Sequence, residues 1–252
     1  MFYRSVGKTD TGAVVELILS LRAKMPVKPL IRIGPDQDGG YLLPDDLDGI
    51  RYAFSPGIAY ESRFEAALAD MGIHVFMADF SVDGPAVANE RFTFLKKFIG
   101  SYNSATHITL DDWIESCIGA DTSDLLLQMD IEGAEYEVLL NCSDRAINQF
   151  RIIVLEVHQM GRLFERSQFP IFQAVFRRLL RTHNVVHIHP NNYCGAVEID
   201  GVTIPHIMEL TFYRNDRPVE GFFLGKYPHP LDRPNKSNKP EMVLPDIWAR
   251  EP

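Results

Sequence analysis

Apolar and polar positions follow two different periods along the chain, and the pattern predicts strands alternating with helices. The most continuous apolar run is 125–129, and it ends at Asp130. A short run of this kind is typical of a strand buried on both faces of a parallel sheet. The acidic stretch 132–137 follows, and the first turn of a helix favours such charges. A strand followed by an acidic turn and a helix is the arrangement of an open α/β sheet. We therefore predict such a sheet, with its ligand at the carboxyl ends of the strands.

The rest of the chain repeats this alternation. Short runs rich in β-branched and aromatic residues have the length of strands, and longer runs with apolar residues three and four apart have the period of helices. Gly39 and Gly40 turn the chain between two short apolar runs, as in a hairpin. The predicted strands are 30–33, 51–54, 74–78, 91–95, 125–129, 150–158, 185–189 and 205–213, and the predicted helices are 11–23, 60–70, 132–139, 164–181 and one that begins after Thr109.

One unit has the layout of a nucleotide-binding half-fold. The strand 51–54 is followed by the loop Ser55-Pro56-Gly57, a helix, a second strand and then Asp79. A carboxylate about 20 residues past the loop can accept both hydroxyls of a ribose, or it can be a plain strand-end or helix-capping residue. The loop has a single glycine, so the three-glycine fingerprint and pyrophosphate cradle of NAD-binding loops are absent.

Polar side chains stand where several predicted strands end, namely at Asp79, Asp130, Glu156, His158 and Asn191. Glu156 interrupts an apolar strand, so it needs a partner or a place at the water-filled edge. His158 follows two positions later, on the same face of an extended chain, and an imidazole can be neutral near pH 7. We therefore predict that His158 accepts a proton while Asp130 and Glu156 orient it or the substrate. The alternative is that these are structural or solvated strand-end groups.

The same three side chains could instead hold a metal ion. Asp130, Glu156 and His158 offer oxygen and nitrogen ligands of the kind that Mg²⁺ or Mn²⁺ accepts. No tight pair of histidines such as H-x-x-x-H supports a metal site, so the sequence leaves the proton and metal interpretations open.

Composition limits the class of protein. A formal charge of −9, from 25 basic and 34 acidic residues without a long basic run, argues against a nucleic-acid partner. The three cysteines are widely spaced, which predicts neither a disulfide framework nor a structural zinc site. A reduced, cytoplasmic setting is expected, and no segment approaches the roughly 20 apolar residues of a membrane span.

Length and composition predict one principal domain with additions at both ends. The 252 residues, 46% of them apolar, suffice for a single large α/β core. We divide the chain into an N-terminal helical extension (1–29), the α/β domain (30–215) and a proline-rich tail (216–252). The tail is expected to lie on the surface or on a partner subunit, which leaves a homo-oligomer open.

Four short motifs together resemble the FkbM-type S-adenosylmethionine-dependent methyltransferases. They are Asp38-Gly39-Gly40-Tyr41, Phe54-Ser55-Pro56-Gly57-Ile58 running to Phe64-Glu65, Asp130-Ile131-Glu132-Gly133-Ala134-Glu135, and Glu156-Val157-His158. The resemblance covers about 30–215 and implies a Rossmann-like, seven-stranded, mostly parallel class I methyltransferase sheet with helices on both faces and its last strand antiparallel. It also implies O-methylation of a hydroxyl on a sugar, glycan or secondary metabolite.

The resemblance assigns roles to individual residues. The cofactor-binding set that it implies is Gly39, Gly40, Tyr41, Ser55, Pro56, Gly57, Glu61, Asp79, Phe80 and Asp130, with the loop 100–109 beside the adenine. The catalytic set is His158, Asp130 and Glu156. Pro56 departs from the pattern, because loops of this class usually carry a glycine or an unrestricted residue there, and proline removes an N–H.

Two rival functions remain at this stage. An NAD-dependent oxidoreductase uses the same β-α-β half-fold, and the single-glycine loop counts against it. A methyltransferase-like domain that only binds a glycan or a partner is the non-enzymatic alternative. The sequence does not specify the acceptor.

Overall fold

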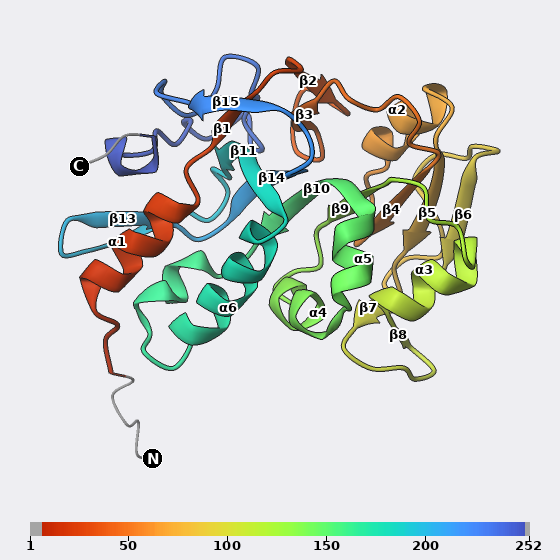
Figure 1. Cartoon of the computed structure of the whole chain (residues 1–252), viewed down its shortest axis with the longest axis horizontal. Helices are drawn as coiled ribbons and strands as arrows, with labels where there is room; N and C mark the ends of the chain where they lie inside the picture. The colour runs from red at the N-terminus through yellow and green to blue at the C-terminus, as the bar shows by residue number, and fades with distance from the viewer. Residues whose placement is uncertain (1–6, 250–252) are drawn as a thin grey trace.

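A seven-stranded sheet forms the centre of the protein, for which a computed structural model describes residues 7–249 (Figure 1). The order across the sheet is β11-β14-β10-β9-β4-β5-β6. All of its strands run in one direction except β14, which is antiparallel to both of its neighbours. The expected mostly parallel sheet with an antiparallel last strand is therefore confirmed. The strands are β4 (Tyr52–Pro56), β5 (His74–Ala78), β6 (Phe92–Leu95), β9 (Leu125–Met129), β10 (Phe150–Val157), β11 (His183–Pro190) and β14 (Met208–Arg214).

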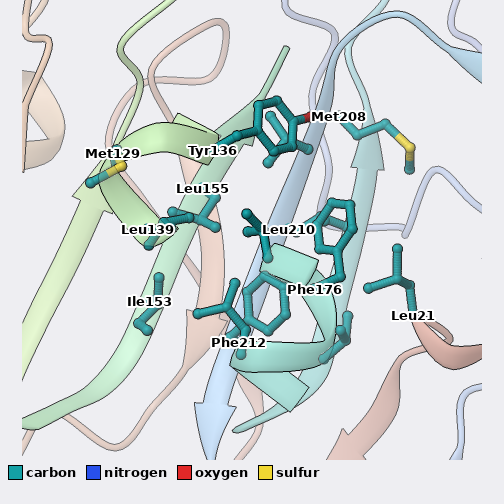
Figure 2. Close-up of a cluster of buried hydrophobic side chains, with 14 of the residues drawn as sticks. Leu21, Met129, Tyr136, Leu139, Ile153, Leu155, Phe176, Met208, Leu210 and Phe212 are labelled. Atoms are coloured by element: carbon teal, nitrogen blue, oxygen red, sulfur yellow. The ribbon is translucent and has the colours of Figure 1, made fainter. Parts of the chain in front are cut away.

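The two faces of the sheet are covered differently. One face carries most of the helices, and Figure 2 shows part of this core, where Leu155 and Leu210 of neighbouring strands lie near Phe176. The other face is covered by α2 (Arg63–Asp70) and by the hairpin of β2 (Leu30–Ile33) and β3 (Tyr41–Pro44). The helices of the first face are α1 (Thr11–Ser20), α3 (Leu110–Ile118), α4 (Glu135–Asn141), α5 (Asp144–Gln149) and α6 (Phe169–Leu180).

Side-chain alternation explains why the central strands are apolar throughout. Along β9, Leu125, Leu127 and Met129 enter the helix-covered core, whereas Leu126 enters the core under the hairpin. All five residues of the strand are buried. Buried polar residues of these strands lie near the carboxyl edge of the sheet. Gln128 of β9 is one of them, and Glu156 of β10 stands opposite Glu209 of β14. Two buried carboxylates in register are unfavourable in a sheet unless something compensates their charge.

Several boundaries differ from the sequence prediction. Helix α4 begins at Glu135 because Glu132 and Gly133 both have positive φ (57° and 106°) and turn the chain first. Strand β4 continues through Pro56, which pairs with Ala78 of β5. Helix α6 begins only at Phe169, because a 3-10 helix, η1 (Met160–Phe164), precedes it.

Three small strand pairs and one helix had not been predicted. Helix α5 follows α4 directly, with Ser143 as its amino-terminal cap. The hairpin β12–β13 turns at Asp200-Gly201, both at positive φ, and an Asp-Gly pair is a strong hairpin signal that the sequence offered. The strand pairs are β7 (Phe98–Gly100) with β8 (His107–Thr109), β12 (Ala196–Ile199) with β13 (Val202–Pro205), and β1 (Lys24–Pro26) with β15 (Val219–Phe222).

The C-terminal tail packs on its own chain as far as residue 249. After β15 it crosses the carboxyl edge of the sheet, where Asp232 pairs with His187 and Asn235 is buried. Its last described turn, η2 (Asp246–Trp248), buries Trp248 completely. Within residues 7–249, no helix combines the length and apolar content needed to cross a bilayer.

His183, at the start of β11, predicts a pH dependence of stability. Its Nε2 donates to the Phe150 carbonyl (2.8 Å), and burial lowers its pKa from 6.5 to about 4. As the pH falls from 6.5 to about 4, His183 binds a proton in the unfolded chain but not in the folded protein, so the free energy of unfolding decreases. The loss attributable to His183 should approach roughly 3 kcal/mol by pH 4. Urea unfolding of the wild type and of His183→Gln between pH 7.5 and 4 measures it: the variant should show a shallower decline, and parallel curves would contradict the assignment.

Candidate active site

Gly57 holds together the ends of three central strands. It has φ +85°, its N–H donates to the Ala78 carbonyl (2.9 Å), and a Cβ added to it would lie 1.6 Å from the Asp130 carbonyl oxygen. The Asp130 N–H in turn donates to the Pro56 carbonyl (3.3 Å). The glycine is therefore required by the close approach of the ends of β4 and β9, which leaves the following loop at the rim of a cleft.

The cleft has a volume of about 560 Å³ and lies above Gly57. This volume falls within the roughly 300–1,000 Å³ of small-molecule sites. Its walls come from four segments: the β2–β3 turn (37–39), the loop 57–61, the end of β9 and the tail segment 235–238. Of the residues predicted from the sequence, Gly39, Tyr41, Gly57, Glu61 and Asp130 line it, whereas Gly40, Ser55, Pro56, Asp79, Phe80, Glu156 and His158 do not.

A chain of buried polar groups forms the floor of the cleft. The Tyr41 hydroxyl accepts from Gln128 Nε2 (3.2 Å). Ser55 Oγ lies 2.7 Å from Gln128 Oε1 and 2.5 Å from Glu65 Oε1. Burial raises the pKa of Glu65 to about 7. Gln128 and Glu65 were not predicted as site residues, although Gln128 is the one polar interruption of the run 125–129.

Asp79 shapes the loop rather than lining the cleft. Its carboxylate is buried and accepts from the Ala59 N–H (2.9 Å) and from the Ser81 N–H (2.7 Å). Ala59 does line the cleft, so Asp79 supports the wall from behind. Phe80 is half-exposed and its ring packs against Phe98 of β7 (5.5 Å between centroids).

The glycines of the β2–β3 turn are required by close packing. A Cβ on Gly39 would come within 2.8 Å of Glu61 Cγ, and one on Gly40 within 2.1 Å of the Pro35 carbonyl oxygen. Glu61 also accepts from the Arg63 N–H (2.8 Å) at the start of α2. The turn and the loop 57–61 therefore contact each other at Gly39 and Glu61, and both line the cleft.

Asp130, Glu156 and His158 come together beside the cleft, as the sequence predicted for residues at neighbouring strand ends. His158 Nε2 lies 3.9 Å from Asp130 Oδ1 and 3.6 Å from Glu156 Oε1. It also lies 3.4 Å from Glu132 Oε2. The Asp130 side chain is 27% exposed and opens onto the cleft, whereas those of Glu156 (7%) and His158 (9%) are buried behind it.

Glu135 fixes the orientation of His158. His158 Nδ1 donates to Glu135 Oε1 (3.1 Å), and the same oxygen accepts from the N–H groups of Ile131 and Gly133 (each 3.1 Å). Because Nδ1 carries this hydrogen bond, Nε2 is the nitrogen that faces the carboxylates. From the sequence alone, Glu135 is predicted only as an acidic residue in the first turn of a helix, so this role was missed.

The electrostatics of this cluster favour added positive charge. Burial raises the pKa of Asp130 to about 7, against the lowering effect of His158. Burial and the charges of Asp130 and Glu209 raise the pKa of Glu156 well above its ordinary range. For His158, burial lowers the pKa, but the bond to Glu135 and the surrounding carboxylates outweigh it, so the net shift is upward.

The remaining polar residues at this edge are paired. His189 Nδ1 donates to Glu209 Oε2 (3.0 Å), and His187 pairs with Asp232 (3.1 Å). Asn191 Nδ2 donates to Glu156 Oε1 (3.3 Å). His187 and His189 thus have structural partners, and Asn191 lies at the carboxyl edge where the sequence placed it.

The sheet order and the polar cleft at its carboxyl edge define a Rossmann-like α/β fold of the methyltransferase class. The family described as "Methyltransferase FkbM domain" matches residues 33–191, more than half of the chain. The protein therefore belongs to the FkbM methyltransferase family. The matched range contains Asp130, Glu156 and His158 but not β14 or the tail.

The similar solved structures have low sequence identity to this chain. Methyltransferase FkbM from Methylobacillus flagellatus KT is 15% identical over 66% of this chain and 44% of its own (TM-score 0.39). A chain of the fibrillarin/Nop5p complex is 13% identical over 67% of this chain and 74% of its own, with a TM-score of 0.38. N-methyltransferase NodS from Bradyrhizobium japonicum WM9 is 12% identical over 81% of this chain and 93% of its own, with a TM-score of 0.34. This chain thus spans less than half of the FkbM structure. A search of curated proteins gave no match.

Proposed function

We propose that the protein transfers the methyl group of S-adenosylmethionine to a hydroxyl group of a sugar, glycan or secondary metabolite. One observation carries this proposal: in a chain of the FkbM family, a cleft of about 560 Å³ lies above Gly57, and Asp130 opens onto it. The acidic lining suits the donor, because Asp38, Glu61 and Asp130 face a molecule that carries a sulfonium and an ammonium charge.

The donor would be held between the β2–β3 turn and the loop 57–61. Gly39 and Glu61 line the two sides, and Tyr41 lies on the floor. Asp79 does not line the cleft, so in place of the ribose contact expected from the sequence it would support donor binding by holding Ala59 in the cleft wall. The donor brings a good leaving group, so the protein needs to align the methyl carbon with the acceptor oxygen and to manage one proton.

We assign the proton to Asp130, Glu156 and His158 as a unit. Their ligand atoms lie within 4.8 Å of one another, so the charge on each group changes the pKa of the other two. Asp130 contacts the cleft and would orient the acceptor hydroxyl, and a pKa of about 7 suits proton transfer near neutral pH. His158 and Glu156 would act from behind Asp130.

Calorimetric titration with S-adenosylmethionine and with NAD⁺ tests the cofactor assignment. The first should bind and the second should not, and the reverse result would favour the oxidoreductase alternative. Donor binding without methyl transfer to any of a panel of sugars and phenols would favour a non-catalytic binding domain.

A variant at Asp79 tests the proposed donor site. Asp79→Asn should weaken donor binding at least about tenfold, because an amide cannot accept from both loop N–H groups as the carboxylate does. Asp83→Asn, at an exposed aspartate four residues further on, is the matched control and should bind normally. Equal affinity of the two variants would remove Asp79 from the donor site.

A further inference from the structure

Three ligand-type side chains converge on one point without a lysine or arginine side chain among them. One carboxylate oxygen each of Asp130 and Glu156 and a ring nitrogen of His158 all lie within 4.8 Å of one another. In the part of the chain described, the ion pairs of Asp130, Glu132, Glu135 and Glu156 all go to His158, and none goes to lysine or arginine. Converging carboxylates without a cation are costly at this depth.

Two buried oxygens in this group have no hydrogen-bond partner. They are Glu156 Oε2 and Asp130 Oδ1. Glu156 as a residue is only 5% exposed, so water cannot readily replace a missing partner. His158 is 7% exposed, and its Nε2 faces carboxylates because Nδ1 is held by Glu135. A histidine oriented by a carboxylate, with its free nitrogen aimed at further carboxylates, is the arrangement of many metal ligands.

A second acidic group on the other side of Glu156 is satisfied by the protein itself. Asp38, Glu156 and Glu209 also lie within ligand distance of one another. There, however, Asn235 Nδ2 donates to Asp38 Oδ1 (3.0 Å) and to Glu209 Oε1 (2.6 Å). The tail amide thus already supplies positive hydrogens on that side. On the side of His158, Asn191 Nδ2 donates to Glu156 Oε1 (3.3 Å), whereas Asp130 Oδ1 has no hydrogen-bond donor among the residues described.

We infer that Asp130, Glu156 and His158 bind one divalent cation, Mn²⁺ or Mg²⁺, at the inner end of the cleft. In octahedral coordination, ligand atoms lie roughly 3 Å apart when adjacent and about 4.3 Å apart when opposite. The observed separations of 3.6 and 3.9 Å from His158 Nε2 exceed the adjacent spacing by less than about 1 Å, so binding of the ion needs only a small inward movement of the side chains. The imidazole ligand favours Mn²⁺ over Mg²⁺.

The inference deepens the proposed function and rests on it only for the role of the ion. A bound divalent cation orients a coordinated hydroxyl group and lowers its pKa. With the ion bound, the lone pairs of Asp130, Glu156 and His158 hold it, so this activation takes the place of proton acceptance by the three side chains. The site would therefore favour acceptors that present two neighbouring oxygens, such as a vicinal diol. The binding itself follows from the protein's own residues and needs neither donor nor acceptor.

Titration of the metal-free full-length protein with MnCl₂, followed by the loss of the free Mn²⁺ electron paramagnetic resonance signal, tests the site. We expect one ion per chain, bound in roughly the micromolar to submillimolar range, and weaker binding of Mg²⁺ in competition. Glu156→Gln and Asp130→Asn should each weaken Mn²⁺ binding by more than about tenfold. Glu137→Gln, an exposed acid in α4, should bind as the wild type does.

The alternatives give different results. No binding at millimolar Mn²⁺, or binding that Glu156→Gln leaves unchanged, would overturn the inference. Thermal melting without metal checks folding, and Glu156→Gln should melt no lower than the wild type, because it removes a buried charge opposite Glu209. Donor binding is measured separately: if the donor binds and Mn²⁺ does not, only the cation is excluded, whereas Mn²⁺ binding without donor binding contradicts the proposed function.

Discussion

His158→Gln is expected to lower kcat for methyl transfer by about two to four orders of magnitude, the usual contribution of a group that manages a proton. Glutamine can still donate to Glu135, but it has no basic nitrogen to place beside Asp130 and Glu156. The affinity for the donor should stay nearly unchanged, because His158 does not line the cleft. Single-turnover methylation with labelled donor measures the chemical step, and calorimetry measures the affinity.

Glu137→Gln is the matched control for this experiment. It neutralises an exposed carboxylate on the same helix as Glu135, outside the cluster. Its kcat should equal that of the wild type. If His158→Gln also turns over normally, His158 has no part in the mechanism.

Gly57→Ala should destabilise the protein by more than about 4 kcal/mol, a large share of the 5–15 kcal/mol typical of a domain. A left-handed backbone costs a non-glycine residue roughly 1–2 kcal/mol. The larger contribution is steric, since the new Cβ would stand 1.6 Å from the Asp130 carbonyl oxygen and neither backbone can move without separating β4 from β9. Urea unfolding, or the yield of folded protein if none survives, measures the effect.

Gly72→Ala separates the two causes. Gly72 has φ +90°, close to the +85° of Gly57, but a Cβ there meets nothing within 4 Å. Its substitution should therefore cost only the backbone contribution, roughly 1–2 kcal/mol. Equal losses at the two positions would show that the contact with Asp130 is unimportant.

The fold was largely predictable because the central strands carry their own signal. The bounds of β5 and β9 agree with the sequence prediction, and Thr109 caps α3 by accepting from the Asp112 N–H (3.2 Å). Helix α4 was placed too early because acidic residues favour a helix start without fixing it. The loop with positive φ at Glu132 and Gly133 is held by Glu135 Oε1, which accepts from the Gly133 N–H and also from the distant His158.

The site was predictable only where it depends on strand ends. The neighbouring strands β9 and β10 are parallel, so their carboxyl ends lie at the same edge of the sheet. This places Asp130, at the end of β9, beside Glu156 and His158 at the end of β10. Glu209 and Asn235 were missed because β14 is inserted between β10 and β11 and because the tail returns from far along the chain. Nothing in local sequence shows that a tail amide will meet Asp38.

The path of the tail has a practical consequence. Residues 235–238 form one wall of the cleft, although they lie outside the range 33–191 that the family shares. A shortened chain that ends with β14 would keep every strand of the central sheet and still lose this wall, uncovering Asp38 and Glu209. Crystallisation trials, acceptor screens and domain fusions therefore need the tail intact, because a fragment that ends with β14 would present a cleft open on one side to its ligands.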